Sequence, residues 1–285
     1  MKNFLILDGN ACIHRAYHAL PPLFTSSNQQ VNAVYGFIRL LLKIKSVFDP
    51  DYIAVCFDYP SKNFRHKIFK EYKANRKPLD EGLISQMPLV REAVDALNVS
   101  RVEVQGYEAD DLIATIVKHN KENSVQTIIA TCDKDMLQLI EGENVLVWND
   151  SKDIMYDVKK VEEKYGVKPN QLIDIFALTG DVVDNVAGIK GIGNKTAVKL
   201  LKEYGTLKNI LQNAGSIKGR VGKLLQQGRD NAELSKKLIE LDFNVPLDYK
   251  LNNFENKDLD VDEAVSFFER HEFKSLVGKY SQQEL

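Results

Sequence analysis

The sequence predicts an α/β protein with a mostly parallel central sheet, flanked by helices and followed by a helical region. In the first half, short apolar runs rich in β-branched and aromatic residues alternate with longer helical patterns. From about Val158 onward the sequence shows helical patterns only, separated by glycine and proline. Regular alternation of strand and helix signals favours a parallel sheet that is covered by its crossover helices.

Each strand of the first half is predicted from a buried-type apolar run, at residues 4–7, 52–57 and 127–130, with a further strand at 144–148. VEVQGY, residues 102–107, is expected to form another strand edge. Helical spacing of apolar residues predicts helices over 34–47, 87–97 and 109–120. The opening MKNFLILDGN meets Asp8 after a short apolar run, so we expect a buried strand there and no signal peptide. In the second half, VKKVEEKYG, PNQLIDIFALTG, KTAVKLLKEYG, AELSKKLIELD and VDEAVSFFERH read as helices.

The change from alternating strand and helix patterns to helical patterns alone predicts a domain boundary near residue 160. Residues 1–160 would form the α/β core, and 161–285 a helical region with a glycine-punctuated hairpin module at about 170–210. Within the core, residues of about 60–90 form a polar, basic and aromatic segment that fits neither pattern. We expect this segment to form a helical arch that projects from the body.

Composition is that of an ordinary globular chain of 285 residues, 44% hydrophobic and 27% charged. No apolar segment approaches the length that a membrane span requires, so no membrane partner is expected. The three cysteines, Cys12, Cys56 and Cys132, are scattered and odd in number. This pattern argues against a disulfide framework or a zinc site and favours a reducing cytoplasm.

Positive charge is gathered in two blocks although the net charge is only −2. Residues 62–77 carry seven basic side chains against one acid, and residues 186–229 carry nine against one. The acidic residues are therefore concentrated elsewhere. Such an asymmetry favours an anionic polymer as the partner.

Acidic residues follow strand after strand in the predicted sheet. FLILD ends in Asp8, YIAVCFD in Asp58, and TIIATCDKD in Asp133 and Asp135. GYEADDLIATIV places Glu108, Asp110 and Asp111 at a helix start, where one acid is ordinary but three repel one another. LTGDVVDN adds Asp181 and Asp184, which we expect on one face of a helix from their i, i+3 spacing. Because ligands gather at the carboxyl ends of parallel strands, these acids are predicted to converge.

A cluster of carboxylates in a cleft is costly without cations, because repulsion and desolvation oppose ionisation. Oxygen ligands without histidine or cysteine suit Mg²⁺ or Mn²⁺ far better than Zn²⁺. Two such ions about 4 Å apart can assist hydrolysis of a phosphodiester. The acidic set therefore predicts a divalent-metal phosphodiesterase.

Other phosphate-handling sites lack their required residues. Asn10 stands where a haloacid-dehalogenase-type phosphatase needs a second Asp, and the residues after Asp8 include no serine of a metal-dependent adhesion site. No glycine-rich GKS or GKT loop is present, which argues against a nucleotide triphosphatase.

A helix–hairpin–helix is predicted at AGIKGIGNKTAVKLLKEYG, residues 187–205. Its glycines permit a tight turn and close backbone approach, and the helix that starts near Asn194 or Lys195 presents free N–H groups to an anion. Such modules bind the phosphate backbone without reading bases. A plain turn between two packed helices is the simpler alternative. The lysine in the first turn and the surrounding basic block favour the DNA-binding interpretation.

Basic and aromatic residues interleave in KNFRHKIFKEYKANRK, where Arg65, Lys73 and Arg76 alternate with Phe64, Phe69 and Tyr72. This mixture suits single-stranded nucleic acid, since bases stack on rings and phosphates pair with cations. A solvated amphipathic helix would have the same composition. Its position directly after Asp58 favours the nucleic-acid interpretation.

In chain order, these motifs resemble the 5′ nuclease family, specifically the N-terminal 5′→3′ exonuclease domain of bacterial DNA polymerase I. Five blocks carry the resemblance across nearly the whole chain: LDGNACIHRAYHALPPL, VCFDYPSKNFRHKIFKEYKANR, GYEADDLIAT, TCDKDMLQL and TGDVVDNVAGIKGIGNKTA. The resemblance implies a resolvase- or PIN-like core, a helical arch and a C-terminal helix–hairpin–helix. It further implies a cytoplasmic, nucleoid-associated bacterial enzyme that cuts 5′ flaps and 5′ ends of branched DNA with two or more Mg²⁺ ions.

The resemblance assigns roles to individual residues. Its metal-binding positions match Asp8, Asp58, Glu108, Asp110, Asp111, Asp133, Asp135, Asp181 and Asp184. Catalytic roles fall to Lys73 and Arg76, which would steady charge on the scissile phosphate, and to Asp111. DNA-binding positions are Arg15, Arg65, Tyr72, Lys73, Arg76, Gly191, Gly193, Lys195 and Thr196. The family's hairpin also holds a K⁺ ion.

The expected substrates are branched DNA and RNA–DNA primer junctions, bound by a monomer. A non-catalytic branched-DNA-binding module and an RNA-directed nuclease of the related single-domain fold remain alternatives. Whether the chain stands alone or forms part of a polymerase stays open, as does the balance of exonuclease and flap activity.

Three positions depart from the family pattern. Val183 replaces a common Ser and Ala187 a common Pro, changes that would loosen the loop or alter a DNA contact. Cys132 replaces a Gly, and we expect it to be a small packed residue; a redox-sensitive thiol is the alternative.

Overall fold

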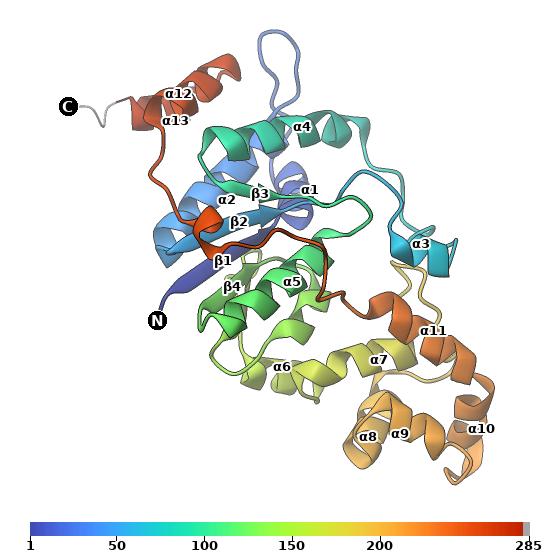
Figure 1. The fold of residues 1–285 in the computed structure, drawn as a ribbon. Coiled ribbons are helices and arrows are strands. Elements are labelled where there is room, and N and C mark those ends of the chain that lie inside the picture. Colours follow the sequence, from blue (N-terminus) through green and yellow to red (C-terminus); the bar gives the residue numbers. More distant parts are fainter. Residues whose placement is uncertain (282–285) are drawn as a thin grey trace. The chain divides into compact units, whose positions relative to one another are not determined.

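A computed structural model describes residues 1–281 of the chain (Figure 1). Its contacts divide the chain into two units, both discontinuous in sequence. The first contains residues 1–59, 78–132 and the C-terminal segment from 243, and the second contains 60–77 and 133–242. The domain boundary expected near residue 160 remains a prediction.

The first unit is built on four parallel strands in the order β3-β2-β1-β4. They are β1 (Asn3–Asp8), β2 (Tyr52–Cys56), β3 (Ser100–Val102) and β4 (Gln126–Ala130). In the register, Asp8 lies beside Cys56, and Leu7 lies beside Ala130. The strands are almost entirely buried, as their continuous apolar sequences predict. Their carboxyl ends therefore meet at one edge of the sheet.

Helices connect these strands and cover the sheet. They are α1 (Gly9–Ala19), α2 (Asn32–Phe48), α4 (Glu81–Ala96) and α5 (Ala109–Glu122). The first three pack together, and α5 packs against β1, β2 and β4. Along the chain, β2 and β3 are added on one side of β1, whereas β4 is added on its other side. Right-handed crossovers therefore place α5 on the face of the sheet opposite to α1, α2 and α4.

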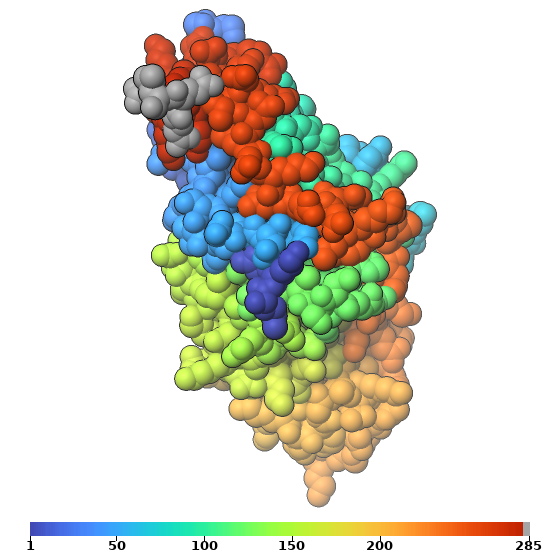
Figure 2. All heavy atoms as spheres, turned by 60° about the vertical axis from the view of Figure 1, so that its left-hand side comes forward, coloured from blue at the N-terminus to red at the C-terminus, as the bar shows by residue number. Residues whose placement is uncertain are grey.

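The C-terminal segment of the first unit returns to the sheet and its helices. Glu255 forms a bridge with Tyr52, and the Tyr249 ring stacks on His119 of α5 at 4.6 Å. Beyond η3 (Leu251–Phe254), helices α12 (Val261–Arg270) and α13 (Lys274–Tyr280) close the segment. Figure 2 shows this orange-red segment lying against the blue and green parts of the same unit. It therefore belongs to the strand-bearing unit despite its distance in sequence.

The second unit is mainly helical. An antiparallel pair, β5 (Val145–Asn149) and β6 (Ile154–Tyr156), follows η1 (Lys134–Leu139). The remaining helices are α6 (Val158–Tyr165), η2 (Pro169–Gln171), α7 (Leu172–Thr179), α8 (Asn194–Tyr204), α9 (Leu207–Gln212), α10 (Gly219–Gln227) and α11 (Arg229–Ile239). The core of this unit forms where α7 packs against α8 and α11.

The segment expected to be a projecting arch packs into the second unit. It contains the short helix α3 (Phe64–Ile68), capped by the side chain of Asn63. Arg65 of α3 is only 1% exposed, and its guanidinium donates from Nε to Leu238 O at 2.9 Å and from Nη2 to Glu240 O at 2.8 Å. Residues 60–77 are therefore anchored to the chain that leaves α11, not free of the body as predicted.

The fold class predicted from sequence is confirmed, and the strands predicted at 4–7, 52–57, 127–130 and 144–148 are present. The strand edge expected at VEVQGY lies slightly later in the sequence than the observed β3, which ends at Val102. The sequence patterns missed α1, α9, α10, α13 and the short strand β6. These elements are short or, in α1, interrupted by polar and histidine residues, which weakens the helical period. Within residues 1–281, no helix combines the length and apolar character of a membrane span.

Candidate functional site

Asp8 ends β1, Asp58 lies two residues beyond the end of the neighbouring β2, and both are held there by hydrogen bonds. Asp8 caps α1, since Oδ1 accepts from Ala11 N at 3.0 Å while Oδ2 accepts from Thr131 Oγ1 at 2.8 Å. The side chain of Asn10 donates to Asp58 Oδ2 and accepts from Asp58 N, both at 3.0 Å. Asn10, two residues after Asp8, thereby links the two strand ends. The structure brings Asp8 and Asp58 to one edge, as the sequence predicts.

The start of α5 joins the same network. Ala109 N, in the first turn of this helix, donates to Asp58 Oδ1 at 2.8 Å. Glu108 and Asp111 form a capping box, in which each side chain accepts from the other's backbone N–H. Asp111 is fully buried and Glu108 is 8% exposed. Burial raises the pKa of the Cys56 thiol well above its ordinary value, and Asp8 and Asp110 raise it further, which places both carboxylates near the end of β2.

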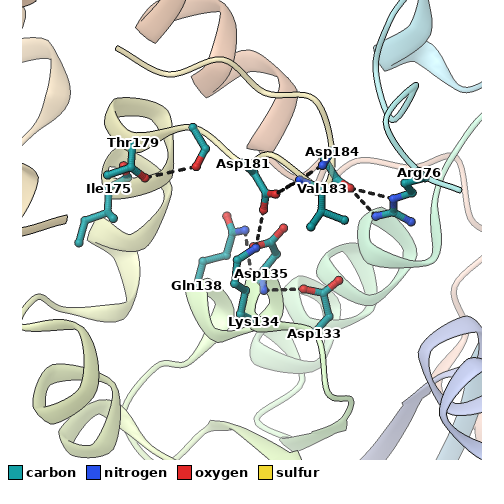
Figure 3. A network of polar contacts seen from close by, with 11 residues as sticks. Arg76, Asp133, Lys134, Asp135, Gln138, Ile175, Thr179, Asp181, Val183 and Asp184 are labelled. Carbon is teal, nitrogen blue, oxygen red and sulfur yellow. Dashed lines mark hydrogen bonds and ion pairs between the residues drawn. The ribbon is translucent and has the colours of Figure 1, made fainter. Parts of the chain in front are cut away.

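The second unit holds another group of acids. Asp133 caps η1, accepting from Asp135 N at 2.8 Å. The Lys134 ammonium lies between two carboxylates, 3.0 Å from Asp135 Oδ1 and 2.5 Å from Asp181 Oδ2 (Figure 3). The same ammonium lies 4.9 Å from the centre of the Phe176 ring. Lys134 therefore joins η1 to the turn that follows α7.

Protonation in this group reflects burial and charge. Burial, with the neighbouring Asp133, raises the pKa of Asp135 to about 6 despite the opposing effect of Lys134. Burial also opposes ionisation of Asp181, but the ammonium of Lys134 outweighs it and lowers the pKa of Asp181. Burial would lower the pKa of Lys134, yet Asp135 and Asp181 raise it. The acids are thus crowded enough to favour a nearby positive charge.

Asp181 and Asp184 lie in a closed turn, not on the helical face that their spacing predicts. Helix α7 ends at Thr179, and Gly180 follows with a φ of 78°. Asp181 and Val186 then exchange backbone hydrogen bonds of 2.8 and 2.7 Å, and Asp181 Oδ1 accepts from Val183 N at 2.8 Å. Because a glycine with positive φ ends the helix before Asp181, the i, i+3 spacing of Asp181 and Asp184 does not place them on one helical face. These bonds close the loop that carries Val183.

The basic segment faces this turn within the second unit. Arg76 donates from Nε and Nη2 to Asp184 Oδ1, at 2.8 and 2.6 Å, as Figure 3 shows. Lys73 has a φ of 60°, and its backbone N–H donates to Asp184 O at 3.0 Å. The structure therefore brings Lys73 and Arg76 to one of the predicted metal-binding acids.

Other predicted DNA-binding residues have different surroundings. Arg65 and Tyr72 are 1% and 5% exposed, and the Arg65 guanidinium is bound to backbone carbonyls. We therefore leave these two buried residues out of the DNA-contact set. Arg15 lies half-buried on α1. Cys132 is exposed, which corrects the expectation of a packed residue, because β4 ends at Ala130 and the loop to η1 has begun.

The hairpin between α7 and α8 has the predicted glycine conformations. Gly188 and Gly191 have φ values of 60° and 93°, and a Cβ at Gly188 would lie 2.2 Å from Gly180 N. Ile189 and Ile192 are buried beneath the turn, which leaves the backbone at Gly191 and Gly193 exposed. Helix α8 starts at Asn194, so Lys195 and Thr196 lie in its first turn. This arrangement presents backbone N–H groups and an exposed lysine together.

The nine predicted metal-binding acids thus fall into two groups, five in the first unit and Asp133, Asp135, Asp181 and Asp184 in the second. Within the part of the chain that the structure describes, no three His, Cys, Asp or Glu side chains already form a metal-binding group. The sequence analysis missed the roles of Asn10, Thr131 and Lys134, which are set by partners distant in sequence. The DKD motif was the one available signal for Lys134.

Family models and curated relatives match nearly the whole chain. The model of the 5′–3′ exonuclease N-terminal resolvase-like domain matches residues 3–166, and that of the 5′–3′ exonuclease C-terminal SAM fold matches 167–262. A 5′–3′ exonuclease of Aquifex aeolicus is 37% identical over 277 residues, which cover 97% of this chain and 94% of that protein. DNA polymerase I of Caldicellulosiruptor bescii is 41% identical over 99% of this chain. The chain spans only 34% of that polymerase.

Solved structures share the fold. The bacteriophage T5 D15 protein, crystallised with metal ions, has a TM-score of 0.74 at 20% identity, covering 85% of this chain and 90% of that one. The catalytic core of Rad2 in complex with DNA substrate has a TM-score of 0.62 at 16% identity, covering 95% of this chain and 88% of that one.

Proposed function

The chain belongs to the 5′–3′ exonuclease family, and we propose that it is a structure-specific 5′→3′ exonuclease and 5′-flap endonuclease. The observation that carries the proposal is the complete acidic set, held at the strand ends of one unit and around η1 and the 181–186 turn of the other. Its substrates would be branched DNA and RNA–DNA primer junctions, and it would act as a monomer in replication and repair.

Divalent cations fit the acidic residues. The donors are all oxygen atoms, which Mg²⁺ and Mn²⁺ prefer. Burial and the neighbouring Asp133 raise the pKa of Asp135, so an additional positive charge there would be stabilising. The ligands would come from Asp8, Asp58, Glu108, Asp110, Asp111, Asp133, Asp135, Asp181 and Asp184. When bound, such ions polarise the phosphodiester and the attacking water.

The basic segment would act on the phosphate. Arg76 is 46% exposed at its side chain, so its guanidinium is accessible as well as bound to Asp184. Lys73 is held next to the same aspartate by its backbone. Their positive charges would stabilise negative charge that develops on the scissile phosphate. Asp111, buried in the capping box, would supply a carboxylate to the metal site and also fix Glu108 and the start of α5.

The hairpin would hold the duplex. Exposed Lys195 and the backbone around Gly191 and Gly193 offer phosphate contacts that do not depend on sequence. Fixing the duplex at a set distance from the acids would decide where the strand is cut. A K⁺ ion at this hairpin remains a prediction.

A labelled 5′-flap DNA incubated with the purified chain tests the proposal, first with Mg²⁺ and then with EDTA. We expect cleavage near the branch with Mg²⁺ and none with EDTA. DNA binding without cleavage would instead indicate a non-catalytic binding module. Preferential cleavage of single-stranded RNA in the same assay would indicate an RNA-directed nuclease.

A further inference from the structure

Two asparagines join the basic segment to the acid-bearing turn. Asn75 Nδ2 donates to Asn185 Oδ1 at 3.0 Å and to Val182 O at 3.2 Å. Asn185 Nδ2 in turn donates to Glu71 O at 2.8 Å. The Asn185 amide therefore both accepts and donates across the same interface. We call these contacts the asparagine clasp.

The two segments that the clasp joins carry the groups proposed to act on the phosphate and to bind metal. Residues 71–76 include Lys73 and Arg76, and residues 181–185 include Asp181 and Asp184. They are more than a hundred positions apart in sequence but lie in the same unit. Besides the clasp, they share the hydrogen bond from Lys73 N to Asp184 O and the Arg76–Asp184 ion pair.

The backbone on both sides is held in a conformation that needs support. Lys73 and Asn185 have φ values of 60° and 57°, in the left-handed region. Asparagine tolerates this region, whereas lysine does so only at a cost. Around Lys73 the chain makes successive tight turns, with hydrogen bonds from Tyr72 N to Phe69 O, from Ala74 N to Glu71 O and from Arg76 N to Lys73 O. Without cross-links, such a series of turns would be free to shift against the acids.

We propose that Asn75 and Asn185 are positioning residues that set the place of Lys73 and Arg76 relative to Asp181 and Asp184. The proposal deepens the nuclease function proposed above and rests on it. Neither asparagine belongs to the proposed catalytic or metal-binding set. They would affect cleavage by holding the charged groups of Lys73 and Arg76 at fixed positions relative to the acids. Small displacements of such groups lower the rate of the chemical step markedly.

Asn75→Ala and Asn185→Gly test the clasp, singly and together. Glycine is chosen at position 185 because it keeps the left-handed conformation while removing the amide. Asn28→Gly is the matched control for that change, since exposed Asn28 also has a φ of 63°. Asn213→Ala is the control for Asn75→Ala, because it removes an exposed amide whose hydrogen bond, to Asn209 O, stays within α9 and its cap.

We expect each clasp variant to lower kcat for flap cleavage by about 10-fold, with KM changed less than about 3-fold. Products should spread over neighbouring nucleotides. The double variant should lose less than the product of the two single losses, because both changes remove the same contact. The control variants should cleave at the wild-type rate and position.

A second measurement does not depend on catalysis. Trypsin can cut the segment at Lys70, Lys73, Arg76 and Lys77, and we expect clasp variants to be cut there at least several-fold faster than wild type and controls, at an unchanged melting temperature. Equal proteolysis together with unchanged kcat and cut position would overturn the proposal. If the wild-type chain failed to cleave any flap, the proposed function would fail, while proteolysis would still decide whether the clasp holds the segment.

Discussion

Arg76 and Asp184, which are 108 positions apart, form an ion pair through Nε and Nη2 of one guanidinium and a single carboxylate oxygen. The pair places a guanidinium, a cation that commonly binds phosphate, directly against an acid predicted to bind metal. A charge that serves only stability would gain little there, because partly exposed ion pairs contribute about 0–1 kcal/mol. We propose that the pair serves the chemistry of the site.

Arg76→Ala should therefore lower kcat/KM for flap cleavage by about 100-fold or more, since it removes charge stabilisation at the phosphate. The free energy of unfolding should change by no more than about 1 kcal/mol. Steady-state kinetics and denaturant titration measure the two quantities. Arg270→Ala, which removes another exposed ion pair, with Glu92, is the control. Wild-type kinetics in the Arg76 variant would exclude a role at the phosphate.

Asp111→Asn should lower cleavage by at least about 10- to 100-fold, because it removes a carboxylate proposed to bind metal, while leaving duplex affinity intact. Asparagine can still accept from Glu108 N, so the cap and the fold should survive. Cleavage rate and DNA affinity are measured on the same preparation. Asp157→Asn changes another helix-capping aspartate, at the start of α6, and should leave cleavage unchanged. Full activity of the Asp111 variant would remove this residue from the site.

Lys195→Glu should weaken binding to duplex DNA and make it less dependent on salt. Losing one phosphate contact lowers the slope of log K against log salt by about 1. Fluorescence anisotropy at several salt concentrations gives that slope. Lys159→Glu, at an 83% exposed lysine of α6, makes the same charge change away from the hairpin. Identical salt slopes for the two variants would count against a DNA contact at Lys195.

Arg65→Met should destabilise the fold by about 3 kcal/mol, because two backbone carbonyls, that of Leu238 buried and that of Glu240 partly buried, would lose hydrogen bonds from a charged donor at about 1.5–3 kcal/mol each. Its DNA affinity per folded molecule should stay at the wild-type level. Chemical denaturation and anisotropy separate the two effects. Normal stability with weakened DNA binding would restore Arg65 to the nucleic-acid interface.

His271 should make stability depend on pH. Burial lowers its pKa, and neither ring nitrogen has a hydrogen-bond partner. The fold therefore favours neutral histidine. The stability that neutral His271 contributes to the fold is fully present above the pKa of about 6.5 in the unfolded chain, and it is lost as the pH falls below that value. His271→Phe should make the free energy of unfolding, measured by urea titration, depend less on pH between pH 7 and pH 5. A slope equal to that of wild type would contradict this assignment.

Much of the fold and of the candidate site was predictable because it depends on local stereochemistry. Alternating apolar runs predicted β1, β2 and β4, and the acids that follow them lie at the carboxyl ends of those strands. The glycines at 188 and 191 predicted a turn that only residues tolerant of positive φ allow. These patterns involve neighbours in sequence, so they can be read without a structure.

Tertiary contacts decided the rest. Arg65 and Arg76 lie in one basic segment, and composition assigns both to DNA. In the fold, however, Arg65 is buried and bonded to carbonyls at the C-terminal end of α11, whereas Arg76 is half-exposed beside Asp184. Likewise, nothing near Asn75 or Lys134 in the sequence names Asn185 or Asp181 as a partner. The sequence by itself determined which side chains are present and where strands, helices and turns begin. Which charges are buried and which meet depends on packing between distant segments, because only the folded chain sets their separation and their exclusion from water.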